Sequence, residues 1–417
     1  MGSMADDADI TYFAKTNHRN SGRMFGIRQC DRRSHFYVCG KTGTGKSWLL
    51  RTMIAQDIAA GRGCALFDPH GDLVRQVYAL IPAERRADIV FINAPDPESI
   101  VRFNPLSGIP AQRRAFATAG FVEVLKKLWP DDWGPRLEHL VRNVILTLLE
   151  SESASLAAIP ALLSDRDFRK ELVAKVETGA VREFWTKEYE RYSPAFRAVV
   201  VAPLQNKLGA LLTDPNLHRV LIDEGDQLDV RAAMDSGKIL LVNLDKGKLG
   251  EGPSSLLGSF LLSHIALVGI SRSDQLEVTR RDFLVYLDEF QNFTTLSIAT
   301  MLSELRKYHV GLVLAHQHLS QLDHAIRDAV FGNAGTVVSF RVGAGDAGYL
   351  AREFAPVFSA EDLISLPRFH VYVRLQIDGE ASRPFSATTL ETPPAADVVA
   401  PARGSRNRRA APLADVV

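Results

Sequence analysis

Eight consecutive residues match a phosphate-binding loop, or P-loop, of the pattern G-x-x-x-x-G-K-[ST] at every fixed position. They are Gly40, Lys41, Thr42, Gly43, Thr44, Gly45, Lys46 and Ser47. The glycines let backbone N–H groups turn inward around a phosphate, Lys46 brings a positive charge to the β- and γ-phosphate oxygens, and the Ser47 hydroxyl can ligate Mg²⁺. The motif therefore predicts a site for ATP and Mg²⁺, in which Lys46 acts in catalysis as well as in binding.

Two adjacent carboxylates, Asp288 and Glu289, follow the apolar run at residues 283–287. Such a run indicates a buried parallel strand, and parallel strands present ligands at their carboxyl ends. Asp288 is placed to hold the Mg²⁺ shell, whereas Glu289 faces the other way and is placed to orient or deprotonate the attacking water. Together with the P-loop, this pair predicts hydrolysis of the nucleotide rather than binding alone.

A polar amide, Gln317, comes after a further apolar run at residues 310–315 and His316. We expect Gln317 to lie beside the strand that carries Asp288, where its amide could sense the γ-phosphate and act in catalysis. An ordinary polar residue in a loop explains the same pattern equally well.

The elements that must position these residues follow a βα rhythm. Apolar or β-branched runs occur at residues 36–39, 64–67, 89–92, 239–244, 283–287, 310–315, 336–342 and 371–376. Between the third and fourth runs, residues 111–234 show the 3.6-residue apolar spacing of successive helices. The sequence predicts an α/β fold with a mostly parallel sheet, formed by residues 9–110 and 235–390 and interrupted by an all-α insertion at residues 111–234.

The two ends of the chain differ in composition from the rest. Residues 1–8 read as a tag scar followed by a flexible, acidic start. Residues 391–417 are rich in Ala, Pro and Arg and poor in large apolar residues, so we expect a disordered tail.

The overall composition favours no particular partner, because 49 Lys and Arg residues balance 49 Asp and Glu residues. The three cysteines lack disulfide or metal-binding spacing and no secretory signal is visible, which indicates a cytoplasmic location. The long apolar run at residues 253–271 suits a buried crossover helix, with a membrane span as the alternative.

Six further short segments of the sequence, taken in their order along the chain, form a pattern that is shared by one group of proteins. They are Asp68-Pro69-His70-Gly71-Asp72, Trp133-Gly134-Pro135-Arg136, Asp288-Glu289-Phe290-Gln291, Arg306-Lys307-Tyr308, Gly332-Asn333-Ala334-Gly335-Thr336 and Phe340-Arg341. With the P-loop, they resemble the HerA/FtsK superfamily of ring-forming DNA pumps. Within it, the chain is most similar to the cytosolic ATPase of conjugative coupling proteins of type IV secretion, which also carry a helical insertion.

The resemblance implies a RecA-like nucleotide-binding domain and a homo-hexameric ring that threads DNA through its centre. It also implies that ATP is bound between subunits and that an arginine of the neighbour completes each catalytic site. Arg306 matches the position of that arginine, and Arg341 is a second candidate. For each, a local ion pair at the protein surface is the alternative.

These features predict an ATP-driven, DNA-translocating motor of the conjugative coupling-protein type, which would move single-stranded DNA and work with a relaxase. One alternative is a HerA-like motor that works with a nuclease in repair or phage defence. Another is an assembly or substrate-docking ATPase of a secretion machine that threads no DNA. Since no apolar span precedes the P-loop, we expect membrane contact only through partners.

Two clusters of basic residues are candidate DNA contacts. The first contains Lys15, Arg19, Arg23, Arg28, Arg32 and Arg33. These side chains suit phosphate contact, although a basic segment that packs on the ATPase domain is the alternative. Lys246 and Lys248 form the second cluster and would either project from a mobile loop toward DNA or form a solvated turn.

Overall fold

The computed structural model describes residues 10–18, 22–99, 101–151, 155–223, 225 and 227–391. Three predictions fall outside these residues. They concern the tag scar at residues 1–8, Arg19 in the basic segment, and all of the predicted tail except its first residue.

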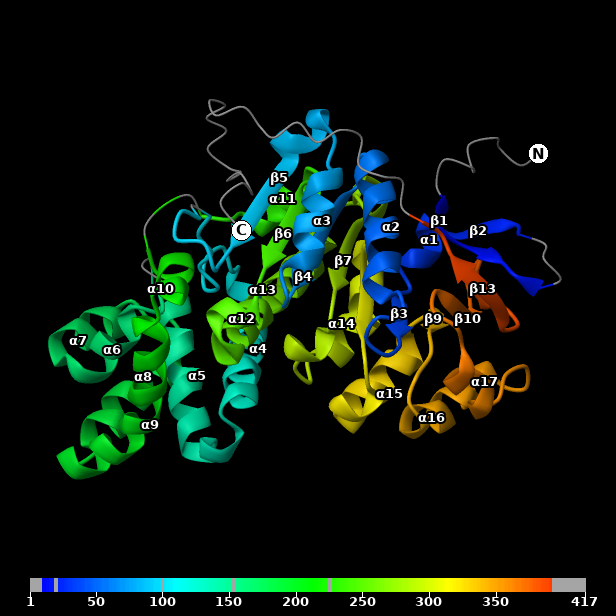
Figure 1. Ribbon diagram of the computed structural model, residues 1–417. Helices are drawn as coiled ribbons and strands as arrows, with labels where there is room; N and C mark the ends of the chain where they lie inside the picture. The colour runs from blue at the N-terminus through cyan, green and yellow to red at the C-terminus, as the bar shows by residue number, and fades with distance from the viewer. Residues whose placement is uncertain are drawn as a thin grey trace.

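Eleven strands form one continuous sheet (Figure 1). In chain order they are β1 Ile10–Thr16, β2 Met24–Arg28, β3 Phe36–Cys39, β4 Gly63–Asp68, β5 Ile89–Asn93, β6 Ile239–Asn243, β7 Phe283–Leu287, β8 Val310–His316, β9 Thr336–Ser339, β10 His370–Arg374 and β13 Phe385–Thr389. Across the sheet their order is β2-β1-β13-β10-β9-β3-β8-β7-β4-β6-β5. A separate ribbon pairs β11 Gln376–Ile377 with β12 Glu380–Ala381.

The sheet is parallel from β9 to β5 and antiparallel from β9 to β2. The parallel part confirms the predicted α/β fold with a mostly parallel sheet. The hairpin of β1 and β2 and the strand β13 were not predicted. Because β13 pairs with β1, the first and last described segments of the chain lie side by side in the sheet.

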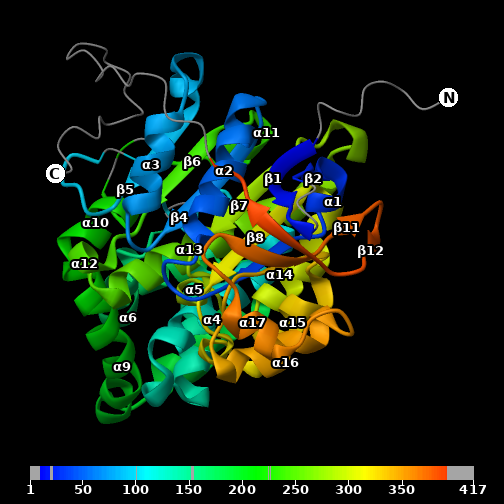
Figure 2. The same cartoon turned by 45° about the vertical axis from the view of Figure 1, so that its right-hand side comes forward.

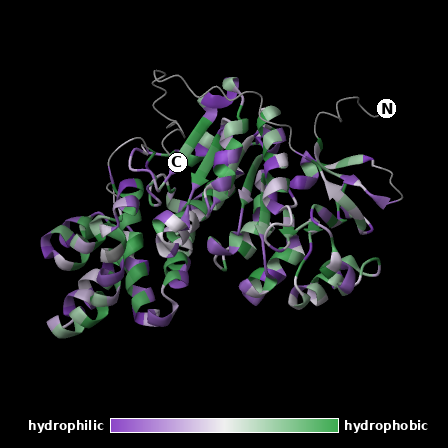
Figure 3. Ribbon diagram, viewed as in Figure 1, coloured by the Kyte–Doolittle hydropathy of each residue, from purple (hydrophilic) through white to green (hydrophobic). Residues whose placement is uncertain are grey.

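Helices cover both faces of the sheet (Figures 1 and 2). Those that lie wholly or partly outside the insertion are α1 Gln29–Arg32, α2 Lys46–Ala59, α3 Asp72–Leu80, α11 Val230–Asp235, α12 Lys246–Leu249, α13 Glu251–Ser271, α14 Ile298–Glu304, α15 His324–Asn333, α16 Ala344–Phe354 and α17 Ala360–Ser365. Phe36 and Val38 of β3 join the core with α2 and α3, while Tyr37 and Cys39 join the core with α13 and α14. This alternation explains why the central strands are hydrophobic along their whole length (Figure 3).

Between residues 111 and 234 the described residues form helices and no strand. These helices are α4 Arg114–Leu128, α5 Pro135–Leu149, α6 Ala158–Ser164, α7 Arg166–Ala174, α8 Gly179–Glu183, α9 Pro194–Thr213, α10 Pro215–Leu221 and the start of α11. Trp185 is buried among them and donates its Nε1 hydrogen to Thr147 Oγ1 at 2.7 Å. The insertion lies at the β5 end of the sheet, opposite the β1–β2 hairpin (Figure 1).

Helix α13 belongs to the one stretch of the described residues that is long and apolar enough to cross a membrane. Within the fold, 83% of its most apolar window is buried. Leu257, Leu261 and Ile265 are fully buried in the same core as α4. Packing inside the protein therefore accounts for the apolar run, as expected of a crossover helix.

The expected DNA contact is wrong for Arg32, because its side chain is only 1% exposed. The Arg32 guanidinium donates to both carboxylate oxygens of Asp57, at 2.5 and 2.9 Å, and to the hydroxyl of Tyr286 at 2.5 Å. Arg32 thus joins α1 to α2 and β7 inside the protein, where no phosphate can reach it.

The other basic residues near α1 are divided between packing and exposure. Arg33 pairs with Asp282 at 2.7 Å, and Arg28 pairs with Asp378. Lys15 and Arg23 are exposed. The packing interpretation therefore holds for Arg28, Arg32 and Arg33, which attach the hairpin to the domain.

Lys246 and Lys248 lie in the short helix α12 rather than in an irregular loop. The Asp245 carboxylate caps this helix by accepting a hydrogen bond from the Gly247 N–H at 3.0 Å. Lys248 is exposed and Lys246 half-buried, and neither forms an ion pair with any described residue. Both follow β6 and so lie at the carboxyl edge of the parallel sheet.

We expect Arg32→Ala to lower the free energy of unfolding by about 3 to 5 kcal/mol, because it leaves the buried Asp57 carboxylate without its main partner. Denaturant unfolding of the purified protein measures this change. Arg28→Ala is the matched control, since it removes an exposed ion pair and should cost about 1 kcal/mol or less. Equal losses in the two variants would contradict a structural role for Arg32.

Candidate active site

The P-loop connects β3 to α2 at the carboxyl edge of the parallel sheet. Gly45 has a φ of +126°, and a Cβ there would lie 2.8 Å from Cδ1 of Phe369. A Cβ on Gly40 would lie 2.5 Å from Cβ of Phe340. Only glycine permits both the positive φ and these close approaches, so the loop can curve tightly against the two aromatic residues.

The amino-terminal end of α2 is suited to an anion. Gly45 caps the helix, and no capping side chain accepts a hydrogen bond from its first turn. The first N–H groups of a helix have no partner within the helix, and the helix dipole favours negative charge at this end. The geometry therefore fits the phosphates that the sequence motif predicts.

Lys46 folds back over the P-loop. Its Nζ donates to the Gly40 carbonyl at 2.6 Å and lies 3.4 Å from the Lys41 carbonyl. Burial lowers the pKa of Lys46, and the negative charges of Glu289 and Asp288 oppose that change. The ammonium is thus held by the loop itself, close enough to two carboxylates to interact with their charge.

Asp288 directly follows β7, and the residue is 5% exposed. Its Oδ1 has no hydrogen-bond partner among the described residues. Burial and the nearby carboxylates of Asp68 and Glu289 raise the pKa of Asp288 to about 7, while Lys46 acts in the opposite direction. A divalent cation fits here, because it would satisfy this oxygen and stabilise the charged carboxylate.

Ser47 is the other predicted Mg²⁺ ligand. It is exposed in the first turn of α2, and its hydroxyl has no hydrogen bond to another described residue. Ser47 follows β3 and Asp288 follows β7, and these strands are separated only by β8. The two side chains can therefore serve one cation at this edge of the sheet.

Gln317 joins the P-loop to Glu289. The Gln317 Nε2 donates to Glu289 Oε1 at 2.7 Å, and its Oε1 accepts from Thr42 Oγ1 at 2.6 Å. Gln291 donates to the second oxygen of Glu289, Oε2, at 3.0 Å. This chain of bonds favours a role for Gln317 in the site over the interpretation as an ordinary loop residue.

The backbone of Glu289 adopts the left-handed conformation, with φ +46° and ψ +54°. This conformation is uncommon outside glycine, and residues that adopt it often lie at functional sites. The Glu289 residue is 6% exposed. Backbone and side chain together hold the carboxylate in one direction, between the amides of Gln291 and Gln317.

The two candidate arginines lie at opposite edges of the sheet. Arg341 follows β9, and its carbonyl accepts a hydrogen bond from the Lys41 N–H at 2.9 Å, which places it beside the P-loop of its own subunit. Arg306 lies in the turn Leu305–Tyr308 before β8, whereas Gln317 follows β8. At about 3.3 Å per residue, β8 separates them by roughly 20 Å. Neither arginine forms an ion pair with another described residue, and both are exposed.

Two residues near the site were not predicted as part of it. Asp68 accepts hydrogen bonds from the N–H groups of His70 and Val74, at 2.8 and 3.0 Å, and its charge acts on Asp288. Lys127 of α4 donates to backbone carbonyls of the turn that follows Glu289. No sequence signal identifies Lys127, because only the fold brings it to this turn.

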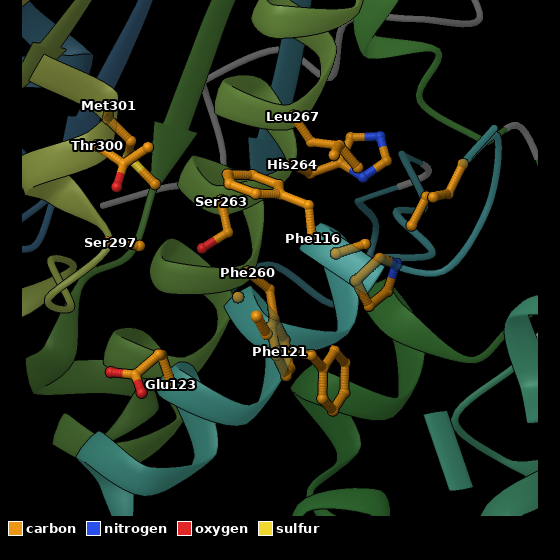
Figure 4. A pocket seen from close by; sticks show the side chains of 15 residues that line it. Phe116, Phe121, Glu123, Phe260, Ser263, His264, Leu267, Ser297, Thr300 and Met301 are labelled. Atoms are coloured by element: carbon orange, nitrogen blue, oxygen red, sulfur yellow. The ribbon is translucent and has the colours of Figure 1, made fainter. Parts of the chain in front are cut away.

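A hollow of about 200 Å³ lies elsewhere, between α4, α13 and α14 (Figure 4). Phe116, Phe260 and Leu267 give it a mostly apolar lining, and burial lowers the pKa of His264 in its wall to about 4. The lining contains no residue of the P-loop and one carboxylate, that of Glu123. The residues that predict hydrolysis therefore lie at the sheet edge and not in this hollow.

The family described as "Type IV secretion-system coupling protein DNA-binding domain" matches residues 25–347, which is more than half of the chain. The chain belongs to this coupling-protein family. The matched region contains the P-loop, both carboxylates, Gln317 and both candidate arginines. The resemblance to coupling proteins is thereby confirmed, and this coupling-protein family member has the fold of a P-loop NTPase.

Solved structures share the fold of this coupling-protein family member. The bacterial conjugative coupling protein TrwBdeltaN70, in its unbound monoclinic form, has a TM-score of 0.63 at 17% identity, and the match covers 88% of this chain and 87% of that chain. The plasmid coupling protein TrwB in complex with ADP and Mg²⁺ has a TM-score of 0.61 at 17% identity, with 88% and 87% covered.

VirB4 of Thermoanaerobacter pseudethanolicus also has a TM-score of 0.61, at 14% identity, and the match covers 94% of this chain and 99% of that chain. A comparison with curated proteins found no match. At these identities the structural likeness shows the fold alone, and it confirms the RecA-like domain that the resemblance implied.

Proposed function

We propose that this coupling-protein family member is an ATP-driven motor that translocates DNA, working in the cytoplasm as a homo-hexameric ring. The observation that carries the proposal is the bonded chain from Thr42 through Gln317 to Glu289, which connects the phosphate-binding loop to a carboxylate held in one direction. The family description, which names a DNA-binding domain, supports DNA as the partner. The complex of TrwB with ADP and Mg²⁺ supports ATP and Mg²⁺ as cofactors.

Each residue of the site has a distinct task in this proposal. The P-loop N–H groups and Lys46 hold the β- and γ-phosphates, and Glu289 orients the attacking water and accepts its proton. Gln317 bonds to both sides of the site, so it can report to Glu289 whether a γ-phosphate is present. Mg²⁺ held by Ser47 and Asp288 would supply neutralisation of phosphate charge.

The placement of the arginines supports the proposed ring. Arg306 lies at the edge of the sheet away from its own P-loop, so it can reach a γ-phosphate only in a neighbouring subunit. Arg341 adjoins its own P-loop, and we assign it to the nucleotide of the same subunit. In this proposal each complete site needs residues of two subunits.

The DNA is single-stranded in our proposal, with a relaxase as the conjugative partner and membrane contact only through other proteins. Lys248, and beside it Lys246, are the DNA-contact candidates that the fold leaves without an ion pair at the carboxyl edge of the sheet. In a ring, several copies of these lysines would combine into a dense positive surface.

We expect single-stranded DNA to increase ATP turnover about tenfold at low salt, and we expect this increase to fall steeply as salt rises, because phosphate contacts release counterions. Turnover of the purified protein with single-stranded DNA, with duplex DNA and without DNA measures the effect. Lys248→Ala should weaken the stimulation without changing basal turnover. The Glu289→Gln variant shows whether a contaminating ATPase contributes.

The likeness to VirB4 favours one second candidate, an assembly or substrate-docking ATPase of a secretion machine that threads no DNA. ATP turnover that is unchanged by DNA at low salt but is increased by a secretion component would support this candidate. The same result would contradict the proposed translocation of DNA. Stimulation by duplex DNA alone would instead favour a HerA-like motor that works with a nuclease.

A further inference from the structure

Lys127 is a lysine of the helical insertion whose ammonium reaches the catalytic edge of the sheet. Its Nζ donates to the carbonyl of Gln291 at 2.9 Å and to that of Asn292 at 2.8 Å. Burial lowers the pKa of Lys127 to about 8, and none of the described carboxylates forms an ion pair with it. Among the described residues this half-buried lysine bonds to two backbone carbonyls and nothing else, which is an unusual use of a charge partly removed from water.

The turn that Lys127 holds, Phe290–Asn292, begins directly after Glu289. Two bonds lead from this turn back to Glu289. The Gln291 side chain donates to the Glu289 carboxylate at 3.0 Å, and the Asn292 N–H donates to the Glu289 carbonyl at 3.0 Å. Lys127 therefore bonds to the backbone of the two residues, Gln291 and Asn292, that themselves bond to Glu289.

The left-handed backbone of Glu289 makes this support necessary. Such a conformation is strained for a residue other than glycine and persists only where the surroundings hold it. Ser255 of α13 donates to the Asn292 carbonyl at 2.6 Å, so it shares that acceptor with Lys127. The Gln291 carbonyl, in contrast, has Lys127 as its only side-chain donor among the described residues.

We propose that Lys127 is a positioning residue for Glu289, through which the helical insertion takes part in ATP hydrolysis. This inference rests on the proposed role of Glu289 in activating water. In this proposal Lys127 acts through the turn and not by contact with the nucleotide or the attacking water. It fixes the turn, the turn fixes the Gln291 amide and the Glu289 backbone, and these fix the carboxylate.

Steady-state ATP turnover of Lys127→Met in the full chain tests the proposal. We expect kcat to fall about 10- to 100-fold, because small displacements of a catalytic group have effects of this size, while KM for ATP changes little. Lys127→Arg should recover most of the turnover, since a guanidinium can donate to both carbonyls. Lys127→Gln, which keeps one donor group, should have an intermediate kcat, and it replaces Lys127→Met if the latter fails to fold.

A double mutant separates positioning from a general effect on stability. Adding Lys127→Met to Glu289→Gln should cause no further loss, because Lys127 acts only through the carboxylate. Lys126→Met is the matched control, since this neighbouring lysine is exposed and should keep wild-type kcat. Thermal unfolding of all variants shows that the comparison is between folded proteins.

Wild-type kcat in Lys127→Met or Lys127→Gln would overturn the proposal, as would additive losses in the double mutant. A different result would show that the proposed role of Glu289 itself is wrong. If Glu289→Gln keeps wild-type turnover, Glu289 is not the water-activating residue, whatever Lys127→Met does. If Glu289→Gln is inactive and Lys127→Met is fully active, only the role of Lys127 is wrong.

Discussion

Glu289→Gln should leave ATP bound but lower its turnover by about 10²- to 10⁴-fold, the range that loss of a general base causes. The amide has nearly the shape of the carboxylate but cannot accept a proton. It also cannot accept hydrogen bonds with both terminal atoms, so the bond from Gln291 or the bond from Gln317 must rearrange. The phosphate contacts of the P-loop and Lys46 are unchanged, which is why binding should persist.

Nucleotide affinity and single-turnover hydrolysis, measured separately, test this expectation. Asp72→Asn is the matched control, because it makes the same carboxyl-to-amide change in an exposed side chain that begins α3 near the same sheet edge. We expect wild-type turnover in that control. A purified Glu289→Gln protein that hydrolyses ATP at the wild-type rate would exclude Glu289 as the base.

Mixing two inactive variants, Lys46→Ala and Arg306→Ala, should restore measurable ATP turnover. Lys46→Ala removes the charge that meets the β- and γ-phosphates, and Arg306→Ala removes the charge offered to the neighbour. In a ring of randomly mixed subunits, about a quarter of the interfaces combine an intact P-loop with an intact arginine. The more independently the sites of a ring hydrolyse ATP, the more turnover these interfaces should restore.

A mixture of Lys46→Ala with Glu289→Gln is the control for this experiment. Both changes lie in the site of one subunit, so no arrangement of subunits brings an intact Lys46 together with an intact Glu289 in the same site, and no recovery is expected. Turnover is compared under ring-forming conditions for each variant alone and for each mixture. If Arg306→Ala alone keeps full turnover and mixing adds nothing, Arg306 is a surface arginine that does not complete the neighbour's site.

The parts of the fold that could be predicted are those in which a short stretch of sequence is compatible with only one local structure. Strands such as β3 and β7 are apolar throughout because both of their faces are buried, so their sequences alone reveal them. The P-loop is equally local, since eight consecutive residues form it. Asp288 and Glu289 then follow from the strand that precedes them.

The rest depends on contacts between distant segments. Strands β1 and β2 mix basic with apolar residues, and they form a sheet edge only because β13, from the other end of the chain, pairs with β1. Arg32 resembled a DNA contact because its buried partners, Asp57 and Tyr286, lie 25 and 254 residues away. Lys127 lies 164 residues from Gln291, so its contact is equally invisible in the sequence.

The segment from Glu289 to Arg306 runs from the carboxyl edge of the parallel strands to their amino edge, and in the proposed ring it carries one residue for each of two sites. Its middle is rigid, since Ile298, Met301, Leu302 and Leu305 are all buried. In a closed ring, a change in the position of Glu289 after hydrolysis would thus move Arg306, which serves the nucleotide of the subunit on one side. Among the described residues, no equivalent segment connects Glu289 to the nucleotide of the subunit on the other side. In a ring of such subunits the clockwise and anticlockwise directions are not equivalent. We therefore expect the sites to hydrolyse ATP in a fixed order around the ring.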